Sequence, residues 1–276
     1  MNPEIFSIGS FSLRWYSVLI LSGIVIAFIL ADREGRKFKL PKDFIFDLTF
    51  WVVIFGIIGA RLYYVVFNFD LYKNDLLSIF KMWNGGLAIH GGIIGGLIAL
   101  IIYCKIRKVN PFRMTDIAVP SLIIAQAIGR WGNFFNSEAH GPVTTLANLQ
   151  NLHIPNFIIK GMYIDGAYYH PTFLYESLWC ILGFILLLLI RKFYKSLKTG
   201  QLTCVYMMWY SVGRIFIESL RTDSLMLGSF KVAQLISIIM FAIGLIVFIY
   251  LCFNPLKRGK YYDKRELKEV KLWYMI

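Results

Sequence analysis

The chain has 276 residues, of which 58% are hydrophobic and 17% aromatic, and its mean hydropathy is +0.62. This composition excludes an ordinary soluble domain. With its long apolar runs separated by short basic stretches, it indicates a polytopic α-helical membrane protein. The net charge of +13 does not indicate a nucleic-acid-binding protein, because the cations gather between the apolar runs.

Seven apolar runs are long enough to cross a hydrocarbon layer of about 30 Å at 1.5 Å per helical residue. Backbone groups inside lipid must be hydrogen-bonded within the protein, which favours helices. The predicted spans are residues 15–31, 46–67, 86–104, 115–132, 171–190, 202–220 and 232–253. The predicted fold class is therefore an all-α polytopic membrane protein with seven transmembrane helices.

Lysine and arginine are distributed unequally over the connections. Segments 32–45, 105–113 and 191–200 and the residues after 253 carry five, four, four and seven of them, against six on the other side. The positive-inside rule then predicts an N-terminus outside and a cytoplasmic C-terminus. Residues 1–253 are expected to form one transmembrane domain. Residues 254–276 are expected to form a basic cytoplasmic tail lying on the membrane surface as a short helix.

The first and third predicted spans carry polar residues at their outer ends. Arg14 and Tyr16 flank the start of the first span, where an aromatic belt is the alternative explanation for the tyrosine. His90 lies just inside the third span, beside the small-xxx-small pair Gly91 and Gly95, which allows another helix or a lipid to approach closely. The imidazole is either hydrogen-bonded to a neighbouring helix or placed to take a proton near neutral pH.

The stretch GRWGNFFNSEAHG, residues 129–141, ends the fourth predicted span with an arginine, two asparagines, a glutamate and a histidine. The connection 133–170 that begins there has one lysine and several glycine, proline and asparagine residues. It predicts a small extracytoplasmic cap between helices 4 and 5.

The last two motifs lie in the fifth and sixth predicted spans. In HPTFLYE, residues 170–176, His170 stands just outside the membrane and Glu176 one to two turns inside. In YSVGRIFIESLR, residues 210–221, the spacing of four places Tyr210, Arg214 and Glu218 on one helix face. Arg214 and Glu218 could simply pair, and Arg221 follows near the outer boundary.

These polar groups are all expected toward the outer half of the bilayer. Each ionisable residue within a span costs about 2.5–3.5 kcal/mol on insertion scales, so a group of them indicates a functional site. Arginines suit a phosphate and amides suit hydroxyls. The combination predicts a binding site for a glycerophospholipid headgroup.

The stretch 129–141 resembles the signature of the prolipoprotein diacylglyceryl transferase family, bacterial inner-membrane enzymes. RWY at 14–16, HGG at 90–92, HPTFLYE at 170–176 and YSVGRIFIE at 210–218 follow in the same order as in that family. The similarity covers nearly the whole chain, from residue 8 to about 251. One departure is Ser137, where many relatives carry glycine, and Trp131 fills another variable position.

The resemblance implies a reaction. Such an enzyme transfers the sn-1,2-diacylglyceryl group of phosphatidylglycerol to the lipobox cysteine thiol of a prelipoprotein. It forms a thioether and releases glycerol 1-phosphate, the first step of bacterial lipoprotein maturation. Phosphatidylglycerol, prelipoprotein signal peptides and membrane lipids are the expected partners, and neither a metal nor an organic cofactor is expected. The implied location is the bacterial cytoplasmic (inner) membrane.

This chemistry requires a thiolate, stabilisation of the departing phosphate, and alignment of carbon and sulfur. Arg130 and Arg214 are the candidates for the phosphate, because arginine keeps its charge in a low dielectric and can grip two oxygens. His90 is the candidate general base. A substrate-positioning role is an equal alternative, with the phosphate or an arginine-stabilised thiolate making a separate base unnecessary.

Further residues have less specific expected roles. Asn133 and Glu138 are candidates for binding headgroup hydroxyls and holding the arginines, or for scaffolding the loop. His170 and Glu176 are expected to gate or brace the cap, and Asn136 to close the turn before Glu138. The remaining substrate-binding candidates are Tyr16, Gly141, Tyr210, Glu218 and Arg221, and the role of His140 stays open.

Two other functions compete with the transferase. A transporter would gather polar groups in a bundle, but the sequence lacks broken midplane helices and inverted repeats. A lipid-binding scaffold with an outer-leaflet headgroup site would need the same polar residues without catalysis.

Overall fold

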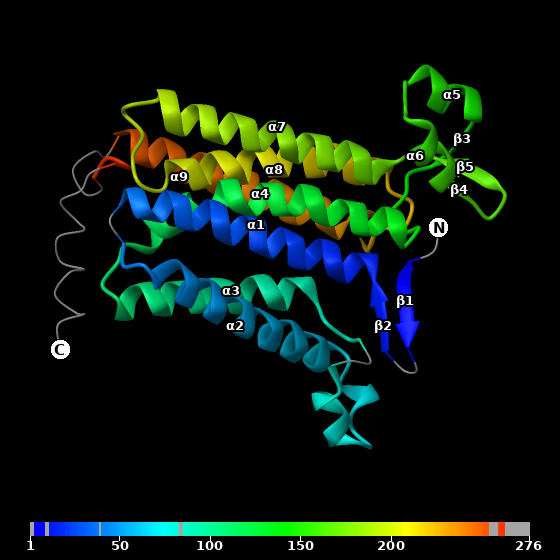
Figure 1. The fold of residues 1–276 in the computed structure, drawn as a ribbon, viewed down its shortest axis with the longest axis horizontal. Coiled ribbons are helices and arrows are strands. Elements are labelled where there is room, and N and C mark those ends of the chain that lie inside the picture. Colours follow the sequence, from blue (N-terminus) through cyan, green and yellow to red (C-terminus); the bar gives the residue numbers. More distant parts are fainter. Residues whose placement is uncertain (1–2, 9–10, 39, 83–84, 254–258, 263–276) are drawn as a thin grey trace. The chain divides into compact units, whose positions relative to one another are not determined.

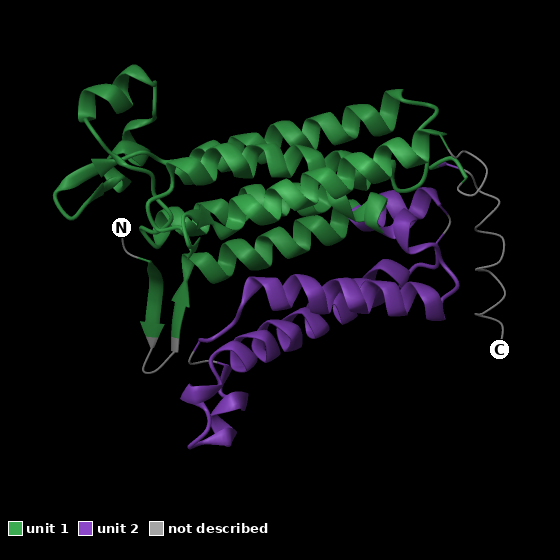
Figure 2. Cartoon of the chain, turned by 180° about the vertical axis from the view of Figure 1, so that it is seen from behind, with its two compact units in different colours: residues 1–30, 115–261 green, residues 31–114, 262–276 purple. Residues whose placement is uncertain are grey.

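The computed structural model describes residues 3–8, 11–38, 40–82, 85–253 and 259–262 (Figure 1). The chain divides into two compact units, drawn in different colours in Figure 2. Unit 1 comprises residues 1–30 and 115–261, and unit 2 comprises residues 31–114 and 262–276. The expected basic tail, residues 254–276, lies outside the described residues except for 259–262.

Within the described part of the chain, five helices are long and apolar enough to cross a membrane. They are α1 (Trp15–Lys37), α2 (Phe44–Phe67), α3 (Ile89–Ile106), α7 (Thr172–Phe193) and α9 (Val232–Phe253). The prediction of a polytopic helical membrane protein is thereby confirmed. The other two predicted spans are also long helices, α4 (Pro111–Phe135) and α8 (Gln201–Leu220). They are less apolar because they carry charged residues along their length, Arg113, Asp116 and Arg130 on α4 and Arg214 and Glu218 on α8.

The ends of the helices differ from the predicted spans for local reasons. Helix α1 continues six residues beyond position 31, to Lys37. Two ion pairs within its last turns stabilise this extension, Arg36 with Asp32 at 2.7 Å and Lys37 with Glu34 at 2.6 Å. Helix α3 begins at Ile89 rather than 86, because Gly86 has a positive φ of 76°. Helix α4 continues to Phe135, so Asn133 belongs to the helix and not to the cap.

In unit 2, glycines bring α2 and α3 into backbone contact. A Cβ at Gly91 would overlap the carbonyl of Gly59, and a Cβ at Gly95 would overlap that of Phe55. The close approach predicted from this small-xxx-small pair is therefore confirmed, with α2 as the partner helix. Between these helices the chain forms two 3₁₀ helices, η1 (Phe69–Leu71) and η2 (Leu76–Phe80).

In unit 1, helices α4, α7 and α8 are joined by buried polar contacts. The Ser177 hydroxyl of α7 donates to the Ala127 carbonyl of α4 at 3.0 Å. The indoles of Trp179 and Trp209 stack, and each donates to the other residue's carbonyl at 3.0 Å, which joins α7 to α8. Each contact satisfies a polar group that the apolar surroundings would leave unpaired.

The buried carboxylate of Asp116 on α4 caps the start of α8. Its oxygens accept from the Thr203 amide at 2.8 Å, from the Thr203 hydroxyl at 2.6 Å and from the Gly200 amide at 2.5 Å. The first amides of a helix have no partner within the helix, and a negative charge there also favours the helix dipole. One side chain therefore fixes where α8 begins relative to α4.

The predicted cap between the fourth and fifth spans is a folded segment with its own small sheet. Its elements are β3 (Val143–Thr144), α5 (Leu146–Asn151), α6 (Asn156–Gly161), β4 (Tyr163–Ile164) and β5 (Ala167–Tyr169). The sheet is antiparallel in the order β3-β5-β4. Phe134, Ile158, Met162 and Phe173 form a buried core that seats the cap on the ends of α4 and α7.

Two β-hairpins were not predicted. The first pairs β1 (Glu4–Ile8) with β2 (Phe11–Arg14) and leads directly into α1. The second pairs β6 (Met226–Leu227) with β7 (Phe230–Lys231) between α8 and α9. Both are too short for an alternating pattern to stand out in an apolar sequence.

A matched pair of glycine substitutions tests the α2–α3 contact. Gly59→Ala places a methyl group against the Gly91 backbone, whereas Gly56→Ala, one turn away, meets the Gly92 carbonyl at an ordinary 3.5 Å. We expect Gly59→Ala to lower the free energy of unfolding by about 1–3 kcal/mol and Gly56→Ala to change it by less than about 0.5 kcal/mol. Thermal unfolding in detergent measures both, and equal midpoints would contradict the contact.

Candidate active site

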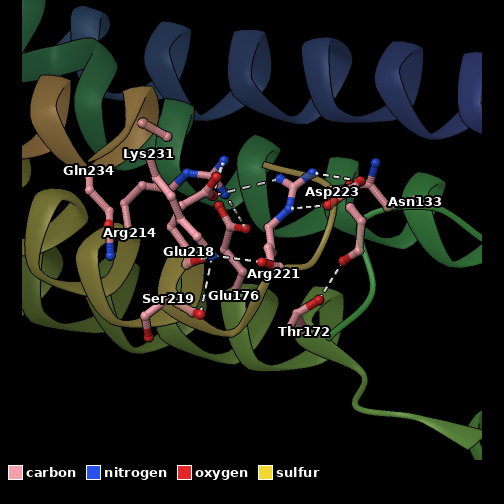
Figure 3. A network of polar contacts seen from close by, with 12 residues as sticks. Asn133, Thr172, Glu176, Arg214, Glu218, Ser219, Arg221, Asp223, Lys231 and Gln234 are labelled. Carbon is pink, nitrogen blue, oxygen red and sulfur yellow. Dashed lines mark hydrogen bonds and ion pairs between the residues drawn. The ribbon is translucent and has the colours of Figure 1, made fainter. Parts of the chain in front are cut away.

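The buried carboxylate of Glu176 joins two arginines from different helices, and Figure 3 shows it beside one of them, Arg214. Glu176 of α7 places Oε1 2.9 Å from Nη2 of Arg130 on α4. Its Oε2 accepts a hydrogen bond from Nη1 of Arg214 on α8 at 3.0 Å. Glu176 is only 5% exposed. The two arginines chosen from the sequence are therefore brought together by a residue expected only to gate or brace the cap.

The network continues along α8 toward its end. Arg214 Nη2 lies 2.7 Å from Glu218 Oε2, so the pairing that their spacing of four allows is formed. The same oxygen is 3.9 Å from Nη1 of Arg221. Arg221 in turn grips Asp223 with two hydrogen bonds of 3.0 and 3.1 Å. Cations and carboxylates thus alternate from α4 to the loop after α8.

Lys231 holds the end of α8 and the β6–β7 hairpin together. Its ammonium group donates to the carbonyls of Glu218, Ser219 and Arg221 at 2.7, 3.2 and 2.6 Å. Because α8 ends at Leu220, no further helical turn pairs the carbonyls of its last residues, and the Glu218 carbonyl also accepts from the Arg221 amide at 3.1 Å. The loop that carries Arg221 is thereby fixed beside Glu218.

Arg130 also has contacts on the side away from Glu176. Its Nη1 donates a long hydrogen bond of 3.5 Å to Oδ1 of Asn133, one turn further along α4, and Tyr210 of α8 lies near the same guanidinium. Asn133 donates to Glu138 Oε1 at 2.9 Å, and Asn136 donates to the same oxygen at 3.2 Å. The two asparagines of the sequence motif therefore both bind its glutamate.

The backbone of this motif needs unusual torsions. Ser137 and Ala139 have φ of 53° and 57°, in the left-handed region that favours glycine. This explains why glycine suits the position that Ser137 occupies here. The turn brings Glu138 back to the end of α4, and Asn136 sits within it, in agreement with its expected role in closing the turn.

Gly141 lies where the cap meets α7. Its amide donates to the His170 carbonyl at 2.9 Å, and a Cβ there would stand 2.8 Å from His170 Cβ. The Thr172 hydroxyl donates to the Ala139 carbonyl, and His170 Nδ1 lies 3.1 Å from the Tyr175 hydroxyl. Gly141 and His170 are thus packing neighbours at this junction.

Two further candidates lie at the rim of unit 1. The Tyr16 ring of α1 rests against Gly132 of α4, where a Cβ would meet the ring. His140 packs on the ring of Tyr169, with centroids 4.1 Å apart, and its carbonyl accepts from Thr222 at 3.4 Å. His140 is therefore held between the cap and the loop after α8.

His90 belongs to unit 2 and is not among the residues that the unit 1 network connects. It is the second residue of α3, partly exposed, with its ring centroid 6.0 Å from that of Tyr63 on α2. The described residues contain no group of three or more histidine, cysteine, aspartate or glutamate side chains that could hold a metal ion.

The central position of Glu176, and the contacts of Asp223 and Lys231, were missed in the sequence. A signal for Glu176 was present, because it is the only acidic residue within the predicted span 171–190. A buried carboxylate in an apolar helix requires a cation from a neighbouring helix. Arg130 and Arg214 were the intramembrane cations available to it in unit 1.

Substituting Glu176 tests the charge balance of this network. Glu176→Gln removes the carboxylate that faces two partly buried guanidinium groups and leaves Arg214 with Glu218 alone, so we expect the free energy of unfolding to fall by about 3–5 kcal/mol. Ser177→Ala, the adjacent control, removes one neutral hydrogen bond and costs about 1 kcal/mol. Thermal unfolding of the purified proteins compares them, and a Glu176→Gln effect no larger than the control would contradict the network.

The Arg221–Asp223 pair gives a pH prediction. Burial raises the pKa of Asp223, but the hydrogen bonds and charge of Arg221 outweigh it and hold the pKa below its ordinary value. The pair therefore stabilises the fold above the unfolded pKa of about 3.9, and this contribution is lost as the pH falls through the lower folded pKa.

We accordingly expect Asp223→Asn to lower the unfolding midpoint by a constant amount between roughly pH 5 and 8. The exposed Asp70→Asn serves as the control, because its partner Lys73 is also exposed. An Asp223→Asn effect that disappears as the pH falls from 8 to 5 would show that Asp223 is protonated there.

The chain is similar over most of its length to known proteins of one family. A family model described as prolipoprotein diacylglyceryl transferase matches residues 3–250. A phosphatidylglycerol–prolipoprotein diacylglyceryl transferase from Listeria innocua is 51% identical over 272 residues, which cover 98% of this chain and 96% of the relative. A protein of the same name from Staphylococcus haemolyticus is 52% identical over 91% of this chain and 88% of the relative. Another, from Staphylococcus aureus, is 51% identical over 92% of this chain and 91% of the relative.

Proposed function

Because the chain belongs to the prolipoprotein diacylglyceryl transferase family, we propose that it transfers the sn-1,2-diacylglyceryl group of phosphatidylglycerol to the lipobox cysteine of prelipoproteins. The products are a thioether-linked lipid and glycerol 1-phosphate, and the reaction is the first step of bacterial lipoprotein maturation. The observation that carries the proposal for this site is the pair of arginines fixed by Glu176.

The proposed setting is the bacterial cytoplasmic membrane, with α4 and α8 as spans in addition to the five apolar helices. The uneven distribution of lysine and arginine supports an N-terminus outside and a cytoplasmic C-terminus. The cap then lies on the extracytoplasmic side. Because the acceptor peptide and the lipid donor both reside in the membrane, they can reach a site at this level without leaving the bilayer.

Arg130 and Arg214 are proposed to bind the phosphate of phosphatidylglycerol. Glu176 holds one guanidinium on each carboxylate oxygen, and this fixes their spacing. Each guanidinium has five N–H donors, more than its contacts with Glu176, Glu218 and Asn133 occupy. N–H groups of the arginines therefore remain available for phosphate oxygens, and the fixed cations stabilise the charge that grows as the ester breaks.

The bond changes define what the site must supply. The cysteine sulfur attacks the terminal glycerol carbon of the diacylglyceryl group, and the bond from that carbon to the phosphate oxygen breaks. The oxygen and its electron pair leave with glycerol 1-phosphate, and the thiol proton passes to a base or to the departing phosphate. No oxidant, metal or organic cofactor is required by this balance.

Other residues are proposed to orient the two substrates. Asn133 and Glu138 would bind headgroup hydroxyls and keep Arg130 in place, since Asn133 contacts Arg130 and Glu138 holds Asn133. Tyr210, Glu218 and Arg221 would hold the arginines rather than react. Tyr16 and Gly141 would shape the site at its rim and below the cap.

His90 is proposed as the general base or as a substrate-positioning residue. Its place near the start of α3 agrees with a position close to the proposed outer surface. Imidazole changes charge within the physiological pH range, which suits it to accept the thiol proton. The two roles predict different dependence of the rate on pH.

The central test measures transfer from phosphatidylglycerol to a short lipobox peptide with one cysteine. We expect Arg130→Lys and Arg214→Lys each to lower kcat/KM by about 100-fold or more, since lysine cannot contact both Glu176 and phosphate. Arg36→Lys, on the exposed end of α1, is the control. Release of glycerol phosphate and the diacylglyceryl mass shift are followed together. Unchanged activity in both variants would contradict the proposal that Arg130 and Arg214 bind the phosphate.

The role of His90 is resolved by the pH profile of His90→Gln. A base role predicts that wild-type kcat/KM falls at acidic pH and that this limb is absent from the much slower variant. A positioning role predicts a raised KM and a pH profile of unchanged shape. Peptide transfer assays over a range of pH values measure both parameters.

A further inference from the structure

Lys231 is the only charged residue of the segment 224–231, and its N–H donors are all used. They reach the carbonyls of Glu218, Ser219 and Arg221 at 2.7, 3.2 and 2.6 Å (Figure 3). An ammonium group has three donors and no acceptor. Lys231 therefore has no N–H group left for a lipid phosphate, and any part that it takes in a reaction must pass through the backbone that it holds.

The end of α8 needs a cation because the chain leaves this helix without a glycine cap. Helices often end at a left-handed glycine, where the following amides pair with the last carbonyls. Here Arg221 follows the helix with φ of −75° and ψ of 139°, and its amide donates to the Glu218 carbonyl. A lysine at the end of a helix supplies the missing donors and also favours the helix dipole.

The β6–β7 hairpin brings Lys231 to this position, since Lys231 pairs with Met226 across the hairpin just before α9 begins. Three residues later, Gln234 of α9 donates from its side-chain amide to the Ile215 carbonyl of α8 at 3.0 Å. Lys231 and Gln234 therefore hold the α8 backbone at Glu218 and Ile215, the two ends of one helical turn.

Two of the three carbonyls that Lys231 holds belong to members of the candidate site. The Glu218 carboxylate lies 2.7 Å from the Arg214 guanidinium. The Arg221 guanidinium donates to Asp223 at 3.0 and 3.1 Å. A shift of the last turn of α8 would therefore move the carboxylate that contacts Arg214 and the neighbouring cation together.

We propose that Lys231 is a positioning residue for the transfer reaction, an inference that rests on the proposed function. It acts through the last turn of α8, which holds Glu218 and thereby Arg214 in the geometry that a phosphate requires. Without the ammonium group, the three carbonyls lose their donor and this turn is free to shift. Stabilisation of developing charge depends on donors that are fixed in advance, and displacements of about 1 Å can cost about 100-fold in rate.

Lys198 provides a matched control, because it makes the same kind of contact at the end of α9. Its ammonium group donates to the carbonyls of Leu251 and Cys252 at 2.7 and 2.9 Å. Lys198 precedes the start of α8, so it lies at the opposite end of that helix from Glu218. Lys198→Met therefore removes a comparable helix cap without touching the candidate site.

The experiment compares Lys231→Met, Lys198→Met and the wild type in the peptide transfer assay, each well below its unfolding midpoint. It measures kcat and the inhibition constant Ki of added glycerol 1-phosphate. This product carries the full charge that grows on the departing phosphate, and its Ki does not depend on the fraction of folded protein. If Lys231→Met does not fold, Lys231→Gln replaces it, since it keeps two amide donors and should show the same changes to a smaller extent.

We expect Lys231→Met to lower kcat and to raise Ki, each about 10-fold, because the arginines are no longer fixed in advance. Lys198→Met should keep the Ki of the wild type although it also lowers the unfolding midpoint. A wild-type Ki in the Lys231 variant would overturn the proposal, since a purely structural role removes active molecules without changing Ki. A wild type without transfer activity would instead overturn the proposed function, and this inference with it.

Discussion

Neutralisation of buried charge is the constraint on which the rest of unit 1 depends. A guanidinium within an apolar bundle needs carboxylate or carbonyl oxygens around it, and a carboxylate needs cations or hydrogen-bond donors. Glu176 meets this requirement for two helices at once, because each of its oxygens contacts a different arginine. The positions of α4, α7 and α8 relative to one another are therefore coupled to the spacing of the two cations proposed to bind phosphate.

The same constraint explains why two long helices differ from the other five. Helices α4 and α8 carry ionised side chains that would oppose their insertion as isolated spans, and α7 supplies the carboxylate that compensates both. At the opposite end, Asp116 of α4 caps α8 through its first amides. Helix α8 is thus held by α4 at its start and through Glu176 near its end. The preorganisation needed for catalysis and the stability of the bundle arise from the same contacts.

The sequence predicted the helical membrane fold because apolar length and backbone hydrogen bonding leave few alternatives. Glycine spacing likewise predicted the close approach of α3 to another helix, found at Gly91 and Gly95. The short hairpins and the cap sheet escaped prediction, since strands of two to five residues carry little periodic signal. Helix ends were displaced by local features, such as the positive φ of Gly86 and the ion pairs that extend α1.

In the candidate site, contacts between residues near in sequence could be predicted, and contacts between distant residues could not. Arg214 and Glu218, which are near in sequence, could be paired from their spacing of four alone. Glu176 could not be paired, because its partners lie 46 and 38 residues away on other helices. Arg61 of α2 could not be paired either, since the four carbonyls that accept from its guanidinium belong to the irregular connection before α3. Long-range polar contacts depend on tertiary packing that no local pattern encodes.

The most direct test of this account is an experimental structure of the protein in a lipid nanodisc with phosphatidylglycerol bound. The account predicts phosphate oxygens within hydrogen-bonding distance, roughly 2.7–3.2 Å, of both Arg130 and Arg214, with Glu176 still between the two guanidinium groups. A headgroup bound away from these arginines would contradict it. So would a phosphate that has displaced Glu176 from both of them.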